Sequence, residues 1–419
     1  MLGRLLNFPP TLARPLRSNF SYLLWDAAWW SLYVGSTGTF LTIYASRIGA
    51  TSQQIGLLTA IPALIALLIS LPLGQWLRRF PAKPATVWSA FSFRMIFALY
   101  PLLPQFLPVN RQYSAILLLI CIITVPSTVL NISFTQFFMD AVPSEWRGAV
   151  IGGRGAIGAI VSLTATLLCG QILTHLRNPL NYQVVFALGF IGAIMTVYQM
   201  IHIHKVDPGP GEALLLDPST VASGQPALAQ KSRFFPRIEG QGRIYLRVIG
   251  LLFLLTLFSN AAAPLVPNLL VQRLKLSDEW ISFGASTNTL VVLLVSLFIA
   301  RITRRTGNRR ATSASIGLHS TSNIILSLAQ GPAFYLVSAV IAGVAGGVSN
   351  VAQNNYFIEH IPSTEKPGWI SINVLLGSIG LLLGALGGPL MASGVGTPAA
   401  MILFGGLELG VGVVILKWG

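Results

Sequence analysis

The sequence contains few charged residues, and this shortage excludes most classes of soluble protein. Only 9% of its 419 residues are Asp, Glu, Lys or Arg, whereas 53% are hydrophobic, and the mean hydropathy is +0.70. A soluble domain carries about 25% charged residues. Uncharged runs recur along the chain, for example over residues 112–139 and 311–358. Each such run is long enough for one or two membrane spans of roughly 20 residues.

Cysteine and histidine are also scarce, which argues against metal, redox and enzyme sites. The two cysteines, Cys121 and Cys169, lie inside apolar runs and are expected to be small core residues. The five histidines show no metal-ligand spacing, and no clustered His, Asp or Ser suggests a membrane enzyme. A glycine-rich phosphate loop is missing too, so an ATP-driven pump is unsupported. We therefore expect no metal, no cofactor and no enzymatic activity.

Negative charge is the scarcer sign, and the net charge is +15. Such an excess can indicate nucleic-acid binding, but here most Lys and Arg residues, Arg154 among them, fall on one side of the expected membrane. This bias follows the positive-inside rule and predicts a multi-pass protein with both termini in the cytoplasm and no nucleic-acid partner. The basic N-terminus lacks a short apolar region with a cleavage site, so we interpret it as a cytoplasmic lead-in.

The apolar runs predict an all-α integral membrane protein with twelve transmembrane helices. The predicted helices span residues 20–46, 54–77, 85–106, 114–139, 149–173, 182–204, 244–270, 279–302, 311–328, 334–358, 369–391 and 399–417. Between the sixth and seventh lies a segment rich in Pro, Gly, Ala and Ser, typical of a flexible cytoplasmic linker. The expected organisation is an N-terminal six-helix bundle over 1–206, a linker over 207–243 and a C-terminal bundle over 244–419.

The two expected bundles show signs of an internal repeat. A shift of 226 residues aligns the basic loop 74–84 with the basic loop 300–310. A shift of 219 residues aligns 131–148 with 350–367. Similar loop composition could produce one such match by chance, but two matches in order favour duplication. Parallel repeats of six spans are a building plan of two-bundle secondary transporters.

The loops also carry motifs of a known family. The pattern Gly74-x3-Arg78-Arg79-x-Pro81-x-Lys83 and its counterpart over 300–310 resemble the major facilitator superfamily's loop signature between helices 2 and 3 and between 8 and 9. The pattern Pro143-x-Glu145-x-Arg147-Gly148 resembles its signature between helices 4 and 5. The resemblance covers the whole chain. It implies two pseudo-symmetric bundles, a cavity lined by helices 1, 4, 7 and 10, and a place in the bacterial inner membrane.

Two departures from the family pattern bear on mechanism. Arg78 and Arg304 stand where the family usually has an aspartate, so we expect a different cytoplasmic gate. In this hypothesis Arg78 or Arg79 pairs with Asp140 or Glu145, and Arg304 or Arg305 pairs with Glu359. The candidate gate residues are Arg78, Arg79, Asp140, Glu145, Arg147, Arg304, Arg305 and Glu359. Helix 5 also lacks the proline of the family's antiporter motif, which disfavours a drug–proton antiporter.

Polar and aromatic residues on the four cavity helices are the candidate substrate contacts. They are Asp26, Trp29, Trp30, Tyr33, Asn131, Thr135, Asn260, Asn350, Gln353 and Asn354. Trp25, Trp29 and Tyr33 lie four residues apart and share one helix face. Amides at membrane depth are costly unless they pair across helices or face water. For each amide, a hydrogen bond between helices is therefore as plausible as contact with a substrate. For each aromatic residue, a position facing lipid is as plausible as contact with a substrate.

Three charges are expected within the membrane, where ionisable residues are expensive and usually functional. Asp26 in helix 1 and Arg94 in helix 3 lie at matching depths, so we hypothesise an ion pair between them. The pair could serve coupling or simply tie the two helices together. Glu408 in helix 12 is the third charge, and a protonated, hydrogen-bonded carboxyl is the simpler interpretation.

Taken together, these features predict a secondary active transporter of a small organic solute that works by alternating access. Symport, antiport and uniport remain open, and protons are a candidate coupling ion. The expected partners are membrane lipid and a small-molecule substrate, and the expected state is a monomer. The alternative is a non-transporting assembly or chaperone-like factor on the same fold. Amides and aromatics fit sugars or amphipathic organic molecules without selecting one.

Overall fold

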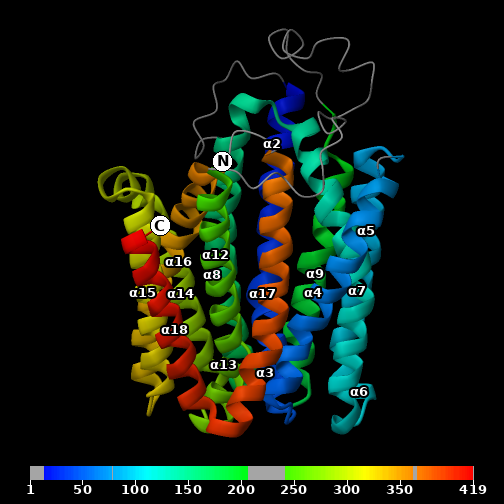
Figure 1. Ribbon diagram of the computed structural model, residues 1–419. Coiled ribbons are helices and arrows are strands. Elements are labelled where there is room, and N and C mark those ends of the chain that lie inside the picture. Colours follow the sequence, from blue (N-terminus) through cyan, green and yellow to red (C-terminus); the bar gives the residue numbers. More distant parts are fainter. Residues whose placement is uncertain (1–13, 78, 206–240, 362–365, 419) are drawn as a thin grey trace.

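The computed structural model describes residues 14–77, 79–205, 241–361 and 366–418, and every regular element in these ranges is helical. The helices lie side by side in one bundle (Figure 1). In the N-terminal half they are α2 (Arg14–Tyr33), η1 (Val34–Gly38), α3 (Thr39–Arg47), α4 (Ser52–Leu77), α5 (Ala82–Ile96), η2 (Phe97–Leu102), α6 (Leu103–Phe106), α7 (Val109–Ala141), α8 (Ser144–His175) and α9 (Leu180–Ile201). In the C-terminal half they are α12 (Gln241–Ala262), α13 (Leu265–Asn268), η3 (Leu269–Arg273), α14 (Asp278–Thr306), α15 (Asn308–Ser327), α16 (Pro332–His360), α17 (Lys366–Val395) and α18 (Thr397–Trp418). The predicted all-α class is confirmed, while the linker prediction over 207–243 falls almost entirely outside the described residues.

Ten helical stretches in the described ranges are long and apolar enough to cross a membrane. The first and ninth predicted spans are not among them. The first comprises α2, η1 and α3, and the ninth, α15, is rich in Ser and Thr. In α15 these hydroxyls are buried and bond to neighbouring backbones: Ser313 donates to the Gly412 carbonyl at 2.7 Å and Ser322 to that of Ser338 at 2.9 Å. The Ser and Thr hydroxyls lower the hydropathy of α15, but hydrogen bonds inside the protein satisfy most of them.

The two basic loops lie at one end of the bundle, which we call the basic end. Figure 1 shows the start of α2, the end of α18, the α4–α5 turn and the α14–α15 turn at this end, uppermost in the view. Arg79 and Arg305 are exposed there. The repeat of basic loops predicted from the sequence thus places both loops on the same face of the protein.

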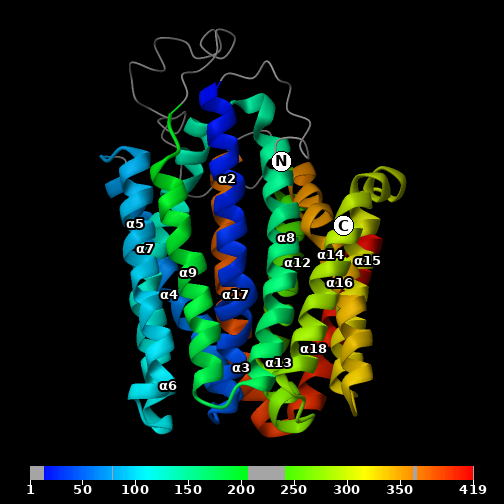
Figure 2. The same cartoon turned by 180° about the vertical axis from the view of Figure 1, so that it is seen from behind.

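The two halves meet along two helix pairs, α8 with α14 and α4 with α17. Glycines let the helices approach closely at both seams. A Cβ added at Gly56 would lie 2.2 Å from the carbonyl oxygen of Ala385, and one at Gly170 would lie 1.9 Å from Ser282 Oγ. Small residues at helix interfaces are a general device for tight packing in membranes. Seen from behind relative to Figure 1, α2 lies at the front between α8 and α9 (Figure 2).

A set of polar contacts joins the halves at the end opposite the basic end, and we call these contacts the latch. Arg47 Nη2 lies 3.0 Å from Asp278 Oδ1 and donates to the Leu276 carbonyl at 2.6 Å. Tyr182 donates to Asp278 Oδ2 at 3.4 Å. The first and second halves are therefore tied by a charged hydrogen-bond network where α3 meets the start of α14.

Neutral side chains extend the latch across the same end. Ser46 donates to Asn268 Oδ1, and Asn268 Nδ2 in turn donates to Ser52 Oγ at 3.0 Å. Gln171 Nε2 donates to Glu279 Oε1 at 3.1 Å. Because these contacts gather at one end, the halves are held together there in this conformation.

Two helices are broken where they approach the latch. In helix 1 the π-helical segment η1 interrupts α2 and α3, and the Ser36 and Thr39 hydroxyls donate to the carbonyls of Leu32 and Val34. In helix 7 the chain breaks after Ala262, because Pro264 has no backbone N–H to continue the ladder.

Glycines of α17 bring it against the backbone of α12. A Cβ at Gly388 would lie 1.9 Å from the Ala261 carbonyl oxygen, and one at Gly384 would lie 2.4 Å from that of Leu257. Gly387 has no atom within 4 Å of such a Cβ. The close approach of α17 and α12 therefore depends on one face of the glycine-rich segment.

Candidate functional site

The N-terminal half contains a polar pocket of about 380 Å³. Five elements line it: α2, α5, α7, α8 and α9. Its residues are Asp26, Trp30, Phe93, Arg94, Ser127, Leu130, Asn131, Phe134, Thr135, Arg154 and Met200. We call this the N pocket. Five residues predicted from the sequence meet here: Asp26, Trp30, Arg94, Asn131 and Thr135.

The centre of the N pocket is a buried salt bridge between α2 and α8. Arg154 Nη1 lies 2.9 Å from Asp26 Oδ2 and also donates to the Leu23 carbonyl at 2.8 Å. The Asp26 side chain is only 3% exposed and that of Arg154 20%. The Arg154 guanidinium also lies over the Phe134 ring, 5.4 Å from its centroid. A buried carboxylate is tolerable in such a place because a charged donor faces it.

Arg94 shares the pocket without forming the predicted salt bridge. It is 2% exposed, and its guanidinium lies over the rings of Trp30 and Phe93 at 5.5 and 5.8 Å. Asp26 bonds instead to Arg154, which the sequence analysis had counted among the cytoplasmic basic residues. The partner of Asp26 is therefore corrected: α8 begins earlier than predicted and carries Arg154 to the depth of the carboxylate.

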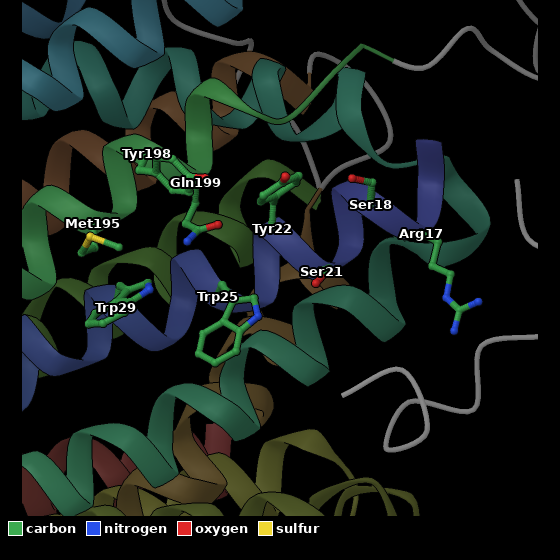
Figure 3. Close-up of a pocket in the computed structure, with 9 residues that line it drawn as sticks. All are labelled: Arg17, Ser18, Ser21, Tyr22, Trp25, Trp29, Met195, Tyr198 and Gln199. Carbon is green, nitrogen blue, oxygen red and sulfur yellow. The ribbon is translucent and has the colours of Figure 1, made fainter. Parts of the chain in front are cut away.

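Two predicted cavity aromatics lie elsewhere. Trp29 lines a separate groove of about 640 Å³ between α2 and α9, together with Trp25 and Tyr198 (Figure 3). Trp25 is 45% and Tyr198 52% exposed. Tyr33 stacks on Phe97 with ring centroids 4.4 Å apart. The shared helix face was predicted to line the cavity, but α2 turns its Trp25 and Trp29 positions toward α9.

The C-terminal half contains a second polar pocket, of about 320 Å³, which we call the C pocket. It is lined by α12, α15, α16 and α18. Its residues are Leu255, Thr256, Ser259, Asn260, Ser315, Ile316, His319, Ala345, Gly346, Ser349, Asn350, Gln353 and Glu408. Asn260, Asn350, Gln353 and Glu408 meet as predicted from the sequence, whereas Asn354 donates to the Asn350 carbonyl and is exposed outside the lining.

Glu408 is the buried charge of the C pocket. It is 1% exposed, accepts a hydrogen bond from Ser259 Oγ at 2.6 Å, and lies 2.8 Å from His319 Nδ1. Its second oxygen, Oε2, has no hydrogen-bond partner among the described residues. His319 is half-exposed and lies beside Asn323. The arrangement is a hydrogen-bonded acid–imidazole pair, and the net charge of such a pair changes by one when it binds or releases a proton.

Solved structures with the same arrangement of helices are transporters. The nucleoside transporter NupG matches with a TM-score of 0.64 and 12% identity, over 97% of this chain and 100% of that chain. A POT family transporter in complex with 5-aminolevulinic acid matches with a TM-score of 0.67 and 14% identity, over 96% of this chain and 95% of that chain. At this identity the likeness shows the fold. No curated protein matches the sequence.

Residues 248–419 match the family model described as Major Facilitator Superfamily. The match covers the C-terminal part of the chain, which is therefore similar to this superfamily. The family match and the ten apolar helices of the described ranges indicate a multi-pass membrane protein. Across the described ranges no group of three or more His, Cys, Asp or Glu side chains could hold a metal ion.

The predicted cytoplasmic gate is only partly described. Arg78 lies outside the described residues, and Arg79 is exposed in the turn before α5. Glu145 occupies the first turn of α8, next to the exposed basic end, while Asp140 is half-buried at the end of α7. Arg147 donates to the Val142 carbonyl at 3.0 Å and to the Met139 carbonyl at 3.2 Å. Arg147 thus closes the end of α7 by satisfying carbonyls that the helix leaves free.

The second half of the gate lies in the equivalent place. Arg304 and Arg305 occupy the last turn of α14. Glu359 near the end of α16 accepts a hydrogen bond from Asn308 Nδ2 at 2.5 Å. The pairing of these arginines with Glu359 stays a prediction, as does that of the first half.

Two residues of the pockets were missed from the sequence. Arg154 carried a signal, because it is a charge inside a predicted apolar helix, but its neighbouring glycines and the nearby loop made it look peripheral. His319 carried none, because a single histidine in a Ser-rich helix has no diagnostic spacing. Only the fold brings it to Glu408, which is 89 positions away in the sequence.

Proposed function

We propose that this protein is a secondary active transporter that carries a small organic solute by alternating access. The observation that carries the proposal is the pairing of two polar pockets, one in each half, with a latch that joins the halves at a single end. In such a design the halves rock about a solute bound between them, and contacts at either end close in turn. The latch described above is the closed end of this conformation.

Size and chemistry support a small solute. Each pocket offers between 300 and 400 Å³, at the small end of the range for pockets that hold small ligands. The neighbours of this fold include a nucleoside transporter and POT family transporters that bind a peptide conjugate or 5-aminolevulinic acid. We infer solutes of similar size here, without carrying over their identity.

Protons are the coupling ion that the C pocket favours. Among the lining residues of that pocket, His319 and Glu408 are the titratable groups, and they share one hydrogen bond. Proton binding changes the charge of this pair at the place where solute would bind. A change of charge in a low-dielectric site alters the free energy of each conformation, which is the requirement for coupling.

The proposed orientation places the basic end in the cytoplasm of a bacterial inner membrane, because basic loops stay on that side. Trp25, Trp29 and Tyr198 in the α2–α9 groove would then lie toward the cytoplasmic side, where such side chains meet lipid headgroups. Labelling of single cysteines at exposed positions of the basic end, such as Arg305, from either side of sealed vesicles tests the orientation.

Transport is tested with purified protein in proteoliposomes. A panel of small organic solutes is first screened by thermal stabilisation of the protein, since a bound ligand raises apparent stability. Stabilising solutes are then measured for uptake with and without a proton gradient. We expect uptake of at least one of them that exceeds uptake by protein-free liposomes. If no solute moves under any gradient but the protein binds a partner protein tightly, it is an assembly or chaperone-like factor instead.

A further inference from the structure

The guanidinium of Arg94 is a buried charge with incomplete hydrogen bonding among the described residues. Arg94 is 2% exposed, and no acceptor among the described residues reaches its Nε. Its Nη1 faces only Met200 Sδ, at 3.8 Å, and a thioether is a weak acceptor. The rings of Trp30 and Phe93 stabilise the cation by contact. Ring contacts do not replace the bonds that five N–H donors can make.

The charges that line the N pocket do not balance. The lining holds two arginines and one aspartate. The aspartate, Asp26, is hydrogen-bonded to Arg154 at 2.9 Å and attracts Arg94 only through space, so the lining keeps one positive charge in excess. An ion taken out of water costs several kcal/mol unless a counter-charge faces it. Such a charge at membrane depth is expected to serve a ligand or an ion path.

The walls of the N pocket indicate what the missing group looks like. A planar guanidinium matches the two oxygens of a carboxylate or the oxygens of a phosphate. Phe134 and Trp30 offer aromatic surface beside it. Asp26 Oδ1 is buried and has no hydrogen-bond partner in the described part of the chain, so it can accept from a hydroxyl or amine on the same ligand. The unmet donors and the unmet acceptor therefore lie in one cavity of about 380 Å³.

We propose that the N pocket is a subsite for the oxyanion group of a small organic acid, with Arg94 as its principal ligand-binding residue. The carboxylate or phosphate of the ligand accepts from the Arg94 guanidinium, and its apolar part lies against Trp30 and Phe134. This inference rests on the proposed function in that it names the solute class of the same transport path. The binding itself can be measured without transport.

The test uses matched acids and amides on the full-length protein in detergent. The carboxylate probes are benzoate and 3-phenyllactate, their neutral partners are benzamide and 3-phenyllactamide, and phenyl phosphate is the phosphate arm. We expect an acid to raise the melting temperature of the protein in a concentration-dependent way. Its amide should need at least a tenfold higher concentration to give the same rise. A comparison of the stabilisation by phenyl phosphate with that by benzoate then shows whether the site prefers a phosphate or a carboxylate.

Variants assign the binding to Arg94. R94Q should lower the affinity for the best acid at least tenfold. R94K keeps the positive charge but loses the planar pair of guanidinium donors, so its affinity should lie between those of R94Q and the wild type. R111Q changes an exposed arginine at the other end and should bind like the wild type. If R94Q does not fold, R94K and the acid–amide comparison on the wild-type protein still decide the matter.

Several results would overturn the inference. They are equal stabilisation by acid and amide, no stabilisation by any acid of the panel, or wild-type affinity in R94K and R94Q. Acid binding without any flux would leave the subsite standing and refute the transporter. Flux of neutral solutes that acids do not inhibit would support transport and refute the subsite.

Discussion

The latch should control which end of the proposed transporter is open, and Arg47 makes its charged contact between the halves. Its guanidinium lies 3.0 Å from Asp278 Oδ1 and 2.6 Å from the Leu276 carbonyl oxygen. The Arg47 side chain is 29% exposed and that of Asp278 13%, so solvent weakens the pair. Charge-assisted hydrogen bonds of this kind contribute about 1–2 kcal/mol after that weakening. The variant R47Q should therefore shift the closed-to-open ratio of this end by roughly 5- to 30-fold.

The shift can be measured as a distance distribution between the halves. Spin labels are placed at Gln53 and Ala333, which are both exposed near the latch in different halves, and are measured by double electron–electron resonance. We expect R47Q to gain a population at longer distance, and D278N to act in the same direction. The double variant should add little, because both single changes remove the same contact.

A matched control separates the latch from a general effect of charge removal. R111Q removes an exposed arginine at the same end, and its distance distribution should equal that of the wild type. A distribution in R47Q that cannot be told from the wild type would refute the latch as a conformational restraint. A longer distance in R111Q as well would point to nonspecific loosening.

Two further predictions concern packing and charge in the membrane. Gly388→Val should prevent or strongly reduce folding, because its first side-chain carbon meets the Ala261 carbonyl, whereas Gly387→Val should be tolerated; the yield of monodisperse protein measures both. R154Q should destabilise the protein by up to about 3–5 kcal/mol because it removes the hydrogen-bonded counter-charge of the buried Asp26 carboxylate. D26N/R154Q should recover much of that loss, and reaction of the buried Cys169 with a thiol dye on heating measures it. Equal stability of the single and double variants would show that the salt bridge is not a structural tie.

Most of the helices could be predicted from the sequence, because a membrane span requires a long apolar run. Long apolar runs mark spans, and basic loops mark one end, so ten helices satisfy the simple span criteria in the described ranges. The first span was predicted as one helix, but η1 interrupts it. The hydropathy of this span does not predict the π-helical segment. That segment depends on hydrogen bonds from side-chain hydroxyls to backbone carbonyls and on packing against α8.

The candidate sites were predictable in part for the same reason. Asp26, Arg94 and Glu408 were found because charge at membrane depth is rare, and the structure places each of them in a polar pocket. Their partners were not found, because partner choice depends on helix rotation and on distances across the bundle. Arg154 and His319 came to these carboxylates only through the packing of α8 on α2 and of α15 on α18.

Solute-driven proton movement in proteoliposomes tests the central claim most directly. A solute that stabilises the protein is added to vesicles that hold a pH-sensitive dye, and the wild type is compared with E408Q. We predict that the solute moves protons in the wild type, and that E408Q loses this proton movement while it still exchanges solute for solute. Solute uptake without any proton movement, or unchanged proton movement in E408Q, would contradict the account of the C pocket as the coupling site.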